Sequence, residues 1–77
     1  MNKARRKAIA DVIDLLYRAK EDLDLLREEE EEYRDNMPEN LQNSERYEKA
    51  DNAVSEMEDA VSSLEDMAMR LEEAIDL

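Results

Sequence analysis

The sequence predicts an all-α fold: an antiparallel two-helix coiled-coil hairpin that we expect to dimerise into a four-helix bundle. Three observations predict it: apolar residues recur every seven positions in two long segments, a short connection containing the single proline separates them, and one antiparallel register pairs the apolar residues of the two segments. Although 44% of the residues are charged, this regular spacing argues against disorder. We expect one helical-hairpin domain over 1–77, with helices over about 3–35 and 44–76 and a connection over 36–43.

The first helix is predicted from two heptad positions, a and d. The a positions are Ile9, Leu16, Leu23 and Glu30, and the d positions are Val12, Ala19, Leu26 and Tyr33. Seven of these eight residues can pack in a core, and Glu30 cannot do so without a polar partner. We expect Glu30 either to specify the register of the bundle or to lie in a frayed helix end.

The first helix should end before Pro38, because a proline disfavours the α conformation in the residue that precedes it. Pro38 can itself begin one short helical turn inside the connection. Asn43 or Ser44 can then cap the second helix, since either side chain can accept a hydrogen bond from a free backbone N–H.

The second helix has a more complete heptad pattern than the first. Its a positions are Tyr47, Val54, Val61, Ala68 and Ile75, and its d positions are Ala50, Met57, Leu64 and Leu71. In an antiparallel pair an a residue of one helix faces a d residue of the other, and the residue numbers of facing partners have a constant sum. With this sum at 80 the facing residues form apolar layers, for example Leu26 with Val54. The same register predicts charge pairs along one edge. These are Arg6 with Glu72, Lys20 with Glu58, and Arg27 with Asp51.

A further row of small and apolar residues follows the other edge of the second helix. We expect the edge to be an oligomer interface, because two helices alone bury little surface. The predicted interface residues are Leu15, Ala53, Ala60, Met67 and Ala74. A monomer with exposed alanines is the alternative, and the sequence leaves open whether two copies pack parallel or antiparallel.

The composition argues against an enzyme. Without Cys or His the chain lacks the usual zinc ligands, the best nucleophile and the usual neutral-pH base, and without Gly it lacks phosphate-binding loops. The run Glu28–Glu32 spreads around the whole helix circumference, so its carboxylates should not converge on a metal ion. We therefore expect no catalytic residue, no metal and no cofactor.

Charge is distributed unevenly along the chain. Residues 1–20 carry a net charge of +4 and residues 21–77 a net charge of −16, for a total of −12. This acidity argues against direct nucleic-acid binding, and we expect the basic cluster Lys3–Lys7 to pair with acidic residues near the C-terminus. No apolar run approaches the ~20 residues of a membrane span, so we expect a cytoplasmic protein with no membrane partner.

The connection and its flanks carry the candidate ligand site. Arginine forks bind phosphate, amides recognise polar edges, and tyrosine rings stack on bases. The candidate ligand-binding residues are Tyr33, Arg34, Asn36, Asn40, Gln42, Arg46, Tyr47 and Lys49. The alternative is an ordinary turn, because Asn, Pro and Ser are frequent turn residues and the tyrosines can simply close the core.

The segment Tyr33–Glu48, which reads YRDNMPENLQNSERYE, resembles the middle of short hypothetical helical-hairpin proteins from Firmicutes and their phages. That group has no assigned activity. The resemblance implies a phage or mobile-element setting, in a bacterial host cell, where small helical proteins commonly act by binding.

Together, these features favour a non-enzymatic binding protein that acts as a phage counter-defence factor. It would sequester a small anionic nucleotide-type immune signal at the loop end, or bind a host defence protein. Two alternatives remain: an acidic mimic of nucleic acid, and a structural coiled-coil dimer used in assembly or scaffolding.

Overall fold

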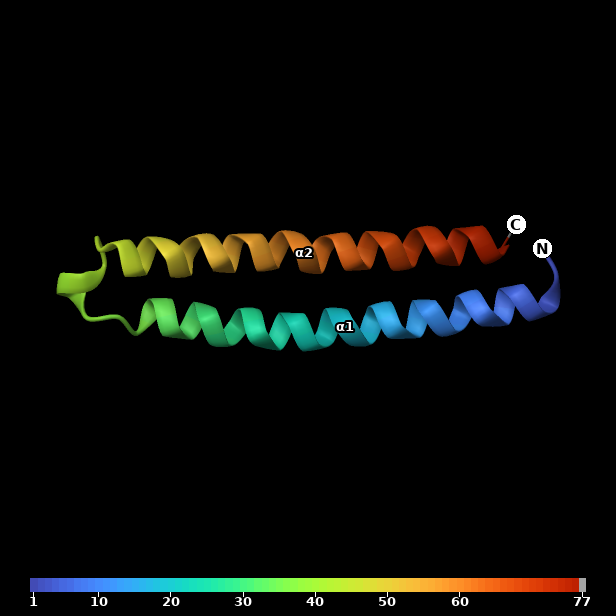
Figure 1. The fold of residues 1–77 in the computed structure, drawn as a ribbon, viewed down its shortest axis with the longest axis horizontal. Helices are drawn as coiled ribbons and strands as arrows, with labels where there is room; N and C mark the ends of the chain where they lie inside the picture. The colour runs from blue at the N-terminus through green and yellow to red at the C-terminus, as the bar shows by residue number, and fades with distance from the viewer. Residues whose placement is uncertain (77) are drawn as a thin grey trace.

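The computed structural model, which describes residues 1–76, is an elongated hairpin of two antiparallel helices (Figure 1). Helix α1 spans Lys3–Asp35, a short 3₁₀ turn η1 spans Glu39–Leu41, and helix α2 spans Glu45–Asp76. The two helices pack along their length, and both termini lie at the same end. The hairpin measures 60 × 15 × 12 Å. These observations confirm the predicted all-α hairpin.

Local hydrogen bonds fix where the helices begin and end. The Asn2 side chain accepts a bond of 2.7 Å from the backbone N–H of Arg5 and so caps α1. Asn36 ends α1, and its backbone N–H donates to the carbonyls of Glu32 and Arg34. At the start of α2, the backbone N–H of Tyr47 donates to Oγ of Ser44, at 3.3 Å. Ser44 therefore caps α2, as one of the two predicted alternatives.

The core is narrow. Within residues 1–76 the buried apolar side chains are Ile13, Met37, Ala50, Val54 and Ala68, and no large side chain is fully buried. On α2 every predicted a and d position is buried or half-buried, so the heptad pattern of this helix is confirmed.

The predicted core face of α1 is confirmed at its a positions, which are all half-buried, but it is wrong at its d positions, because the helix is rotated. The d positions are exposed, at 45% for Val12, 52% for Leu26 and 48% for Tyr33, whereas Ile13 is only 6% exposed. The half-buried positions that continue the line of Ile13 are Lys20, Arg27 and Arg34. The side chains of these cations are at most 30% exposed, and two of them reach α2 through ion pairs, Lys20 with Glu65 and Arg34 with Asp51. This row, rather than the d row, therefore faces α2.

The predicted register is also wrong. Lys20 pairs with Glu65 at 3.4 Å rather than with Glu58, and Asp51 pairs with Arg34 at 2.9 Å rather than with Arg27. The partner numbers sum to 85 for both observed pairs and to 78 for the two expected ones. The cause is an asymmetric connection: the chain buries Met37 and forms η1 before α2 begins, so the first turn of α2 lies beyond the last turn of α1 (Figure 1).

The predicted pairing of the basic N-terminal cluster with the C-terminal acids is not observed. Lys7 pairs with Asp11 on its own helix, and Glu72 accepts a hydrogen bond of 2.8 Å from the hydroxyl of Tyr17. Within residues 1–76, no ion pair involves Arg5 or Arg6.

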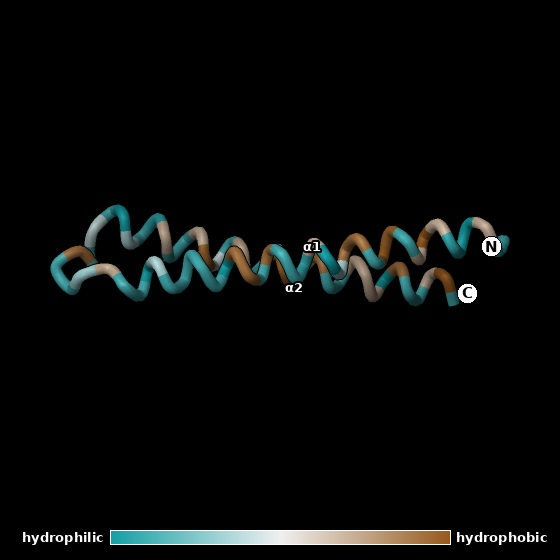
Figure 2. Tube along the Cα trace, turned by 90° about the horizontal axis from the view of Figure 1, so that it is seen from below, coloured by the Kyte–Doolittle hydropathy of each residue, from teal (hydrophilic) through white to brown (hydrophobic). Residues whose placement is uncertain are grey.

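Hydropathy differs between the two ends of the hairpin. Hydrophobic residues gather towards the termini, and the half next to the connection is mostly hydrophilic (Figure 2). Neither α1 nor α2, over the residues described, is long and apolar enough to cross a membrane.

Candidate functional site

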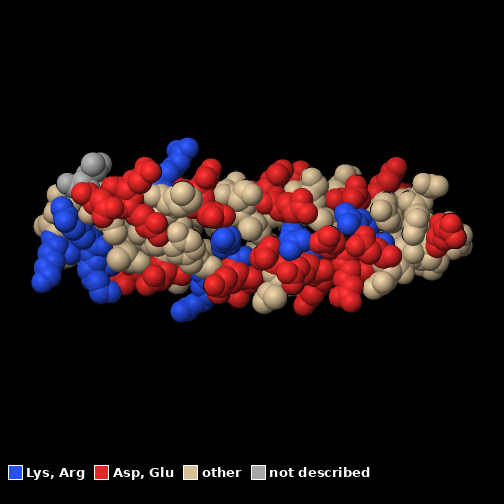
Figure 3. All heavy atoms as spheres, turned by 180° about the vertical axis from the view of Figure 1, so that it is seen from behind, with Lys and Arg blue, Asp and Glu red and all other residues tan. Residues whose placement is uncertain are grey.

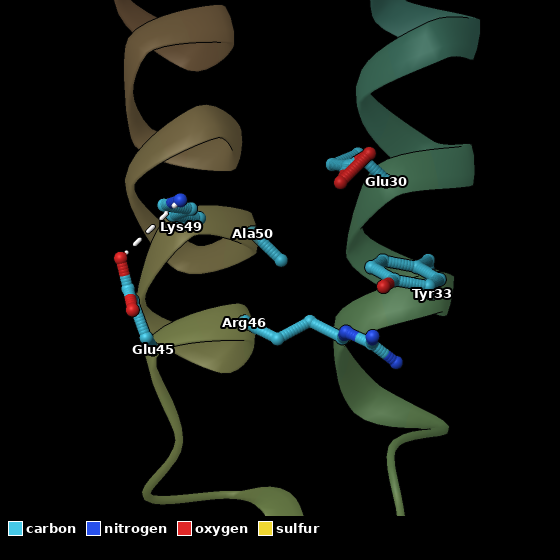
Figure 4. A pocket seen from close by; sticks show the side chains of 6 residues that line it. All are labelled: Glu30, Tyr33, Glu45, Arg46, Lys49 and Ala50. Atoms are coloured by element: carbon cyan, nitrogen blue, oxygen red, sulfur yellow. Dashed lines mark ion pairs between the residues drawn. The ribbon is translucent and has the colours of Figure 1, made fainter.

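A groove of about 440 Å³ opens between α1 and α2 beside the connection (Figure 4). Its lining residues are Glu30 and Tyr33 from α1 and Glu45, Arg46, Lys49 and Ala50 from α2. The structure thus brings together three of the predicted ligand residues: Tyr33, Arg46 and Lys49. Its volume lies within the ~300–1,000 Å³ that is typical of small-molecule sites.

Helical spacing explains why these side chains share one groove. Residues three and four apart lie on one helix face, which places Arg46, Lys49 and Ala50 together on α2 and Glu30 with Tyr33 on α1. Ala50 is buried at the base of this set, and its small side chain leaves the space that the longer side chains surround.

Arg46 is the cation with no carboxylate partner in this groove. None of the ion pairs within residues 1–76 involves it. Figure 4 shows its side chain extending from α2 towards α1, close to the ring of Tyr33. Tyr33 is half-exposed and Arg46 is exposed, so one guanidinium fork and one aromatic ring line the same open groove. This pair can take a phosphate and a planar ring from the same ligand.

Lys49 lies on the outer wall of the groove. Its ammonium group pairs with Glu45, one turn earlier on α2, at 3.3 Å (Figure 4). Both side chains are more than three-quarters exposed, and exposed pairs of this kind contribute only ~0.2–1 kcal/mol. An incoming phosphate can therefore replace Glu45 as the partner of Lys49 at small cost.

Arg34, by contrast, is already neutralised by carboxylates. Its guanidinium group donates to Asp35 and to Asp51, both at 2.9 Å, and lies 3.9 Å from Glu31. The hydrogen bond to Asp35, followed by the one to Asp51, raises the pKa of Arg34 above its usual value. Arg34 therefore acts as a link between the helices and does not line the groove.

The remaining predicted ligand residues lie outside the groove. Asn36, Asn40 and Gln42 are exposed around the connection, where the backbone N–H groups of Asn36 and Gln42 donate to carbonyls of the preceding turn. Tyr47 is half-buried in the first turn of α2. None of these four residues therefore lines the groove with Tyr33, Arg46 and Lys49.

Sequence reasoning did not assign Glu30, Glu45 or Ala50 to the site. The spacing does contain the signal for two of them, because Glu45 lies one turn before Lys49 and Ala50 lies one turn after Arg46. Glu30 was expected to set the register or to lie in a frayed helix end; it is half-buried within α1 and lines the groove.

The acidic run Glu28–Glu32 is partly paired along its own helix. Arg27 donates to Glu31 and lies 3.6 Å from Glu28. Among residues 1–76, no group of three or more acidic side chains is arranged to hold a metal ion.

A second groove, of about 360 Å³, lies on the hairpin near the termini. Its lining residues are Val12, Leu16, Met67, Arg70 and Leu71. Met67 belongs to the predicted oligomer interface. Of the other interface residues, Leu15 and Ala60 are exposed and Ala53 and Ala74 are half-buried.

Comparison with known proteins gives no relative from which a function could be transferred. No protein-family model, no curated protein and no solved structure matches this chain. The function of this chain is therefore inferred from the residues that line its two grooves.

Proposed function

We propose that this chain is a non-enzymatic binding protein that takes a small anionic ligand of the nucleotide type in the groove beside the connection. The observation that carries the proposal is the unpaired guanidinium group of Arg46 beside the half-exposed ring of Tyr33. Phosphate oxygens would accept hydrogen bonds from Arg46 and Lys49, and a base would stack on Tyr33.

The acidic residue in the groove narrows the ligand class. Glu30 would repel a simple anion such as inorganic phosphate, but its carboxylate can accept hydrogen bonds from the hydroxyls of a ribose or the amino group of a base. A ligand with both phosphate and hydrogen-bond donors therefore fits the lining better than phosphate alone.

The biological role that we propose is phage counter-defence in the cytoplasm of a bacterial host, where the bound nucleotide would be an immune signal. The resemblance of Tyr33–Glu48 to a segment of phage-associated hairpin proteins supports this role. A protein that only sequesters its ligand needs no nucleophile and no base, and Cys and His are absent.

The test is native mass spectrometry of protein purified from bacteria that carry an active phage-defence system. We expect a removable mass of a few hundred daltons on the wild-type protein, its loss in Arg46→Ala and its retention in Arg18→Ala, an exposed arginine that does not line the groove. The purified protein is then titrated with ATP and with a cyclic dinucleotide. No bound mass, together with no binding of either probe at about 1 mM, would overturn the proposal.

A second candidate function, a structural dimer with no ligand, is favoured by the apolar groove at Val12 and Met67. In that case Arg46→Ala and Tyr33→Ala leave every measurable property of the assembly unchanged. A charge on the apolar face, as in Met67→Glu, dissociates it.

A further inference from the structure

The rotation of α1 leaves one face of the hairpin with unpartnered apolar side chains on both helices. The docking face, as we name it, consists of Val12, Leu15, Ala19 and Leu26 on α1 and of Ala53, Ala60, Met67 and Ala74 on α2. Val12 and Met67 line the same groove, so the two rows lie on the same side of the molecule. Leu15, at 60% exposed, projects from this face.

The exposed area of one chain is larger than a compact monomer requires. A monomer of 9.1 kDa is expected to expose about 4,900 Å², and this chain exposes 5957 Å². The excess of about 1,000 Å² is similar to the ~800 Å² that each partner buries in a standard protein interface. A second copy of the chain would remove this excess.

The docking face is compatible with a two-fold axis through Ala19. On α1, Val12 and Leu26 lie seven residues on either side of Ala19. On α2, the row is centred between Ala60 and Met67, next to Glu65. Because Lys20 contacts Glu65 across the hairpin, the centres of the two rows lie at nearly the same height. A single two-fold axis can therefore place the α1 row against the α1 row of a second chain and the α2 row against its α2 row.

Charge favours the antiparallel over the parallel arrangement. Residues 20–63, on the loop side of this axis, carry 16 acidic and 5 basic side chains, a net charge of −11, and the terminal side carries only −1. A parallel dimer would place the two loop sides together, whereas an antiparallel dimer separates them. Basic side chains gather at the terminal end (Figure 3), where Arg5 and Arg6 form no ion pair with any residue of 1–76.

We propose that two copies dock antiparallel through this face, with the two-fold axis at Ala19. Val12 then packs on Leu26 of the second copy, and Ala60 packs on Met67 of the second copy. Arg5, fourteen residues before Ala19, lies beside Tyr33 of the second copy, fourteen residues after it. Each groove at the loop end thus receives a cation from the other chain. This proposal does not depend on the proposed ligand.

Cysteine crosslinking tests the orientation, because the natural chain has no cysteine. Val12→Cys and Leu26→Cys chains are mixed and treated with a bismaleimide about 8 Å long, which spans two packed helices. We expect an efficient crosslink in this mixture and only background in a mixture of Val12→Cys and Met67→Cys chains. The reverse result would show a parallel dimer, and background in both mixtures would show that this face is not an interface. Either overturns the proposal.

Ala19→Glu provides a second test, because two carboxylates would meet on the axis. Sedimentation should give about 18 kDa for the wild-type protein, twice the mass of 9.1 kDa, and a monomer for Ala19→Glu at micromolar concentration. Ser55→Glu adds the same charge to an exposed position outside the docking face and should remain dimeric. Far-UV circular dichroism of Ala19→Glu shows whether the separated chain remains helical, and an intact dimer in this variant would contradict the proposed axis.

Discussion

Tyr17 links the two helices near the termini by donating a hydrogen bond from its hydroxyl to Oε1 of Glu72, 2.8 Å away. This bond, followed by partial desolvation and the charge of Glu72, raises the pKa of Tyr17 above its ordinary value of 10.0. A raised pKa in the folded state means that the unfolded chain loses this proton first. The stabilisation is therefore complete below about pH 10 and disappears as the pH rises through the higher folded-state pKa.

We expect the melting temperature of the wild-type protein to fall more steeply above about pH 10 than that of Tyr17→Phe, which has no hydroxyl to ionise. Thermal unfolding followed by circular dichroism from about pH 9 to about pH 12 measures the difference. Tyr33→Phe removes a hydroxyl for which the structure shows no hydrogen bond, and should keep the wild-type profile. Parallel curves for wild type and Tyr17→Phe would show that the bond to Glu72 does not couple to folding.

At the level of the helices, the core face of α1 differs from the one expected from its heptads. Single substitutions on buried and exposed positions of α1 can verify which face packs against α2. Ile13 is buried, whereas Leu25 is 60% exposed. Truncation of a buried isoleucine to alanine costs about 2–5 kcal/mol, and a surface substitution changes stability by less than ~0.5 kcal/mol. We expect Ile13→Ala to lie at the lower end of that range, because the thin core can relax, and Leu25→Ala to be nearly neutral.

Urea unfolding of both variants, at one protein concentration and with unchanged slope, gives these two free energies. Both substitutions shorten an aliphatic side chain on the same helix, so helix propensity is closely matched. Equal losses of stability, or a larger loss in Leu25→Ala, would contradict the observed face of α1.

The sequence was sufficient for the hairpin, because Pro38, the cap at Ser44 and the complete heptads of α2 are local signals. It was insufficient for the face of α1. A heptad count treats Lys20 and Arg27 as polar surface residues, yet both are half-buried in the structure, because long aliphatic stems can be buried while the charged ends remain paired.

The register of the two helices and the composition of the groove could not be predicted from the sequence for a different reason. Both depend on how the connection passes from Met37 through η1, and no spacing rule specifies that path. Three of the eight predicted ligand residues line the groove because helical spacing places them on the faces of α1 and α2 that border it. Arg34 and Tyr47 lie on the same helices outside the groove, and the turn residues do not line it.

For the whole molecule, net charge is the dominant long-range term. The chain carries −12, and −11 of this lies on the loop side of Ala19. The ion pairs across the hairpin join Lys20 to Glu65 and Arg34 to Asp51, and all four side chains are at least partly exposed. Exposed pairs contribute little, so repulsion among the unpaired carboxylates outweighs them.

Salt should therefore stabilise this protein, because it screens the repulsion more than it weakens the few attractive pairs. We expect the melting temperature to rise by several degrees between about 10 mM and about 500 mM NaCl, a range over which the Debye length falls from ~30 Å to below ~5 Å. The Glu28→Gln, Glu29→Gln double variant removes two charges from the acidic run and should show a higher starting temperature and a smaller rise. A melting temperature that falls with salt would mean that the cross-helix pairs, rather than the net charge, dominate the electrostatics of the fold.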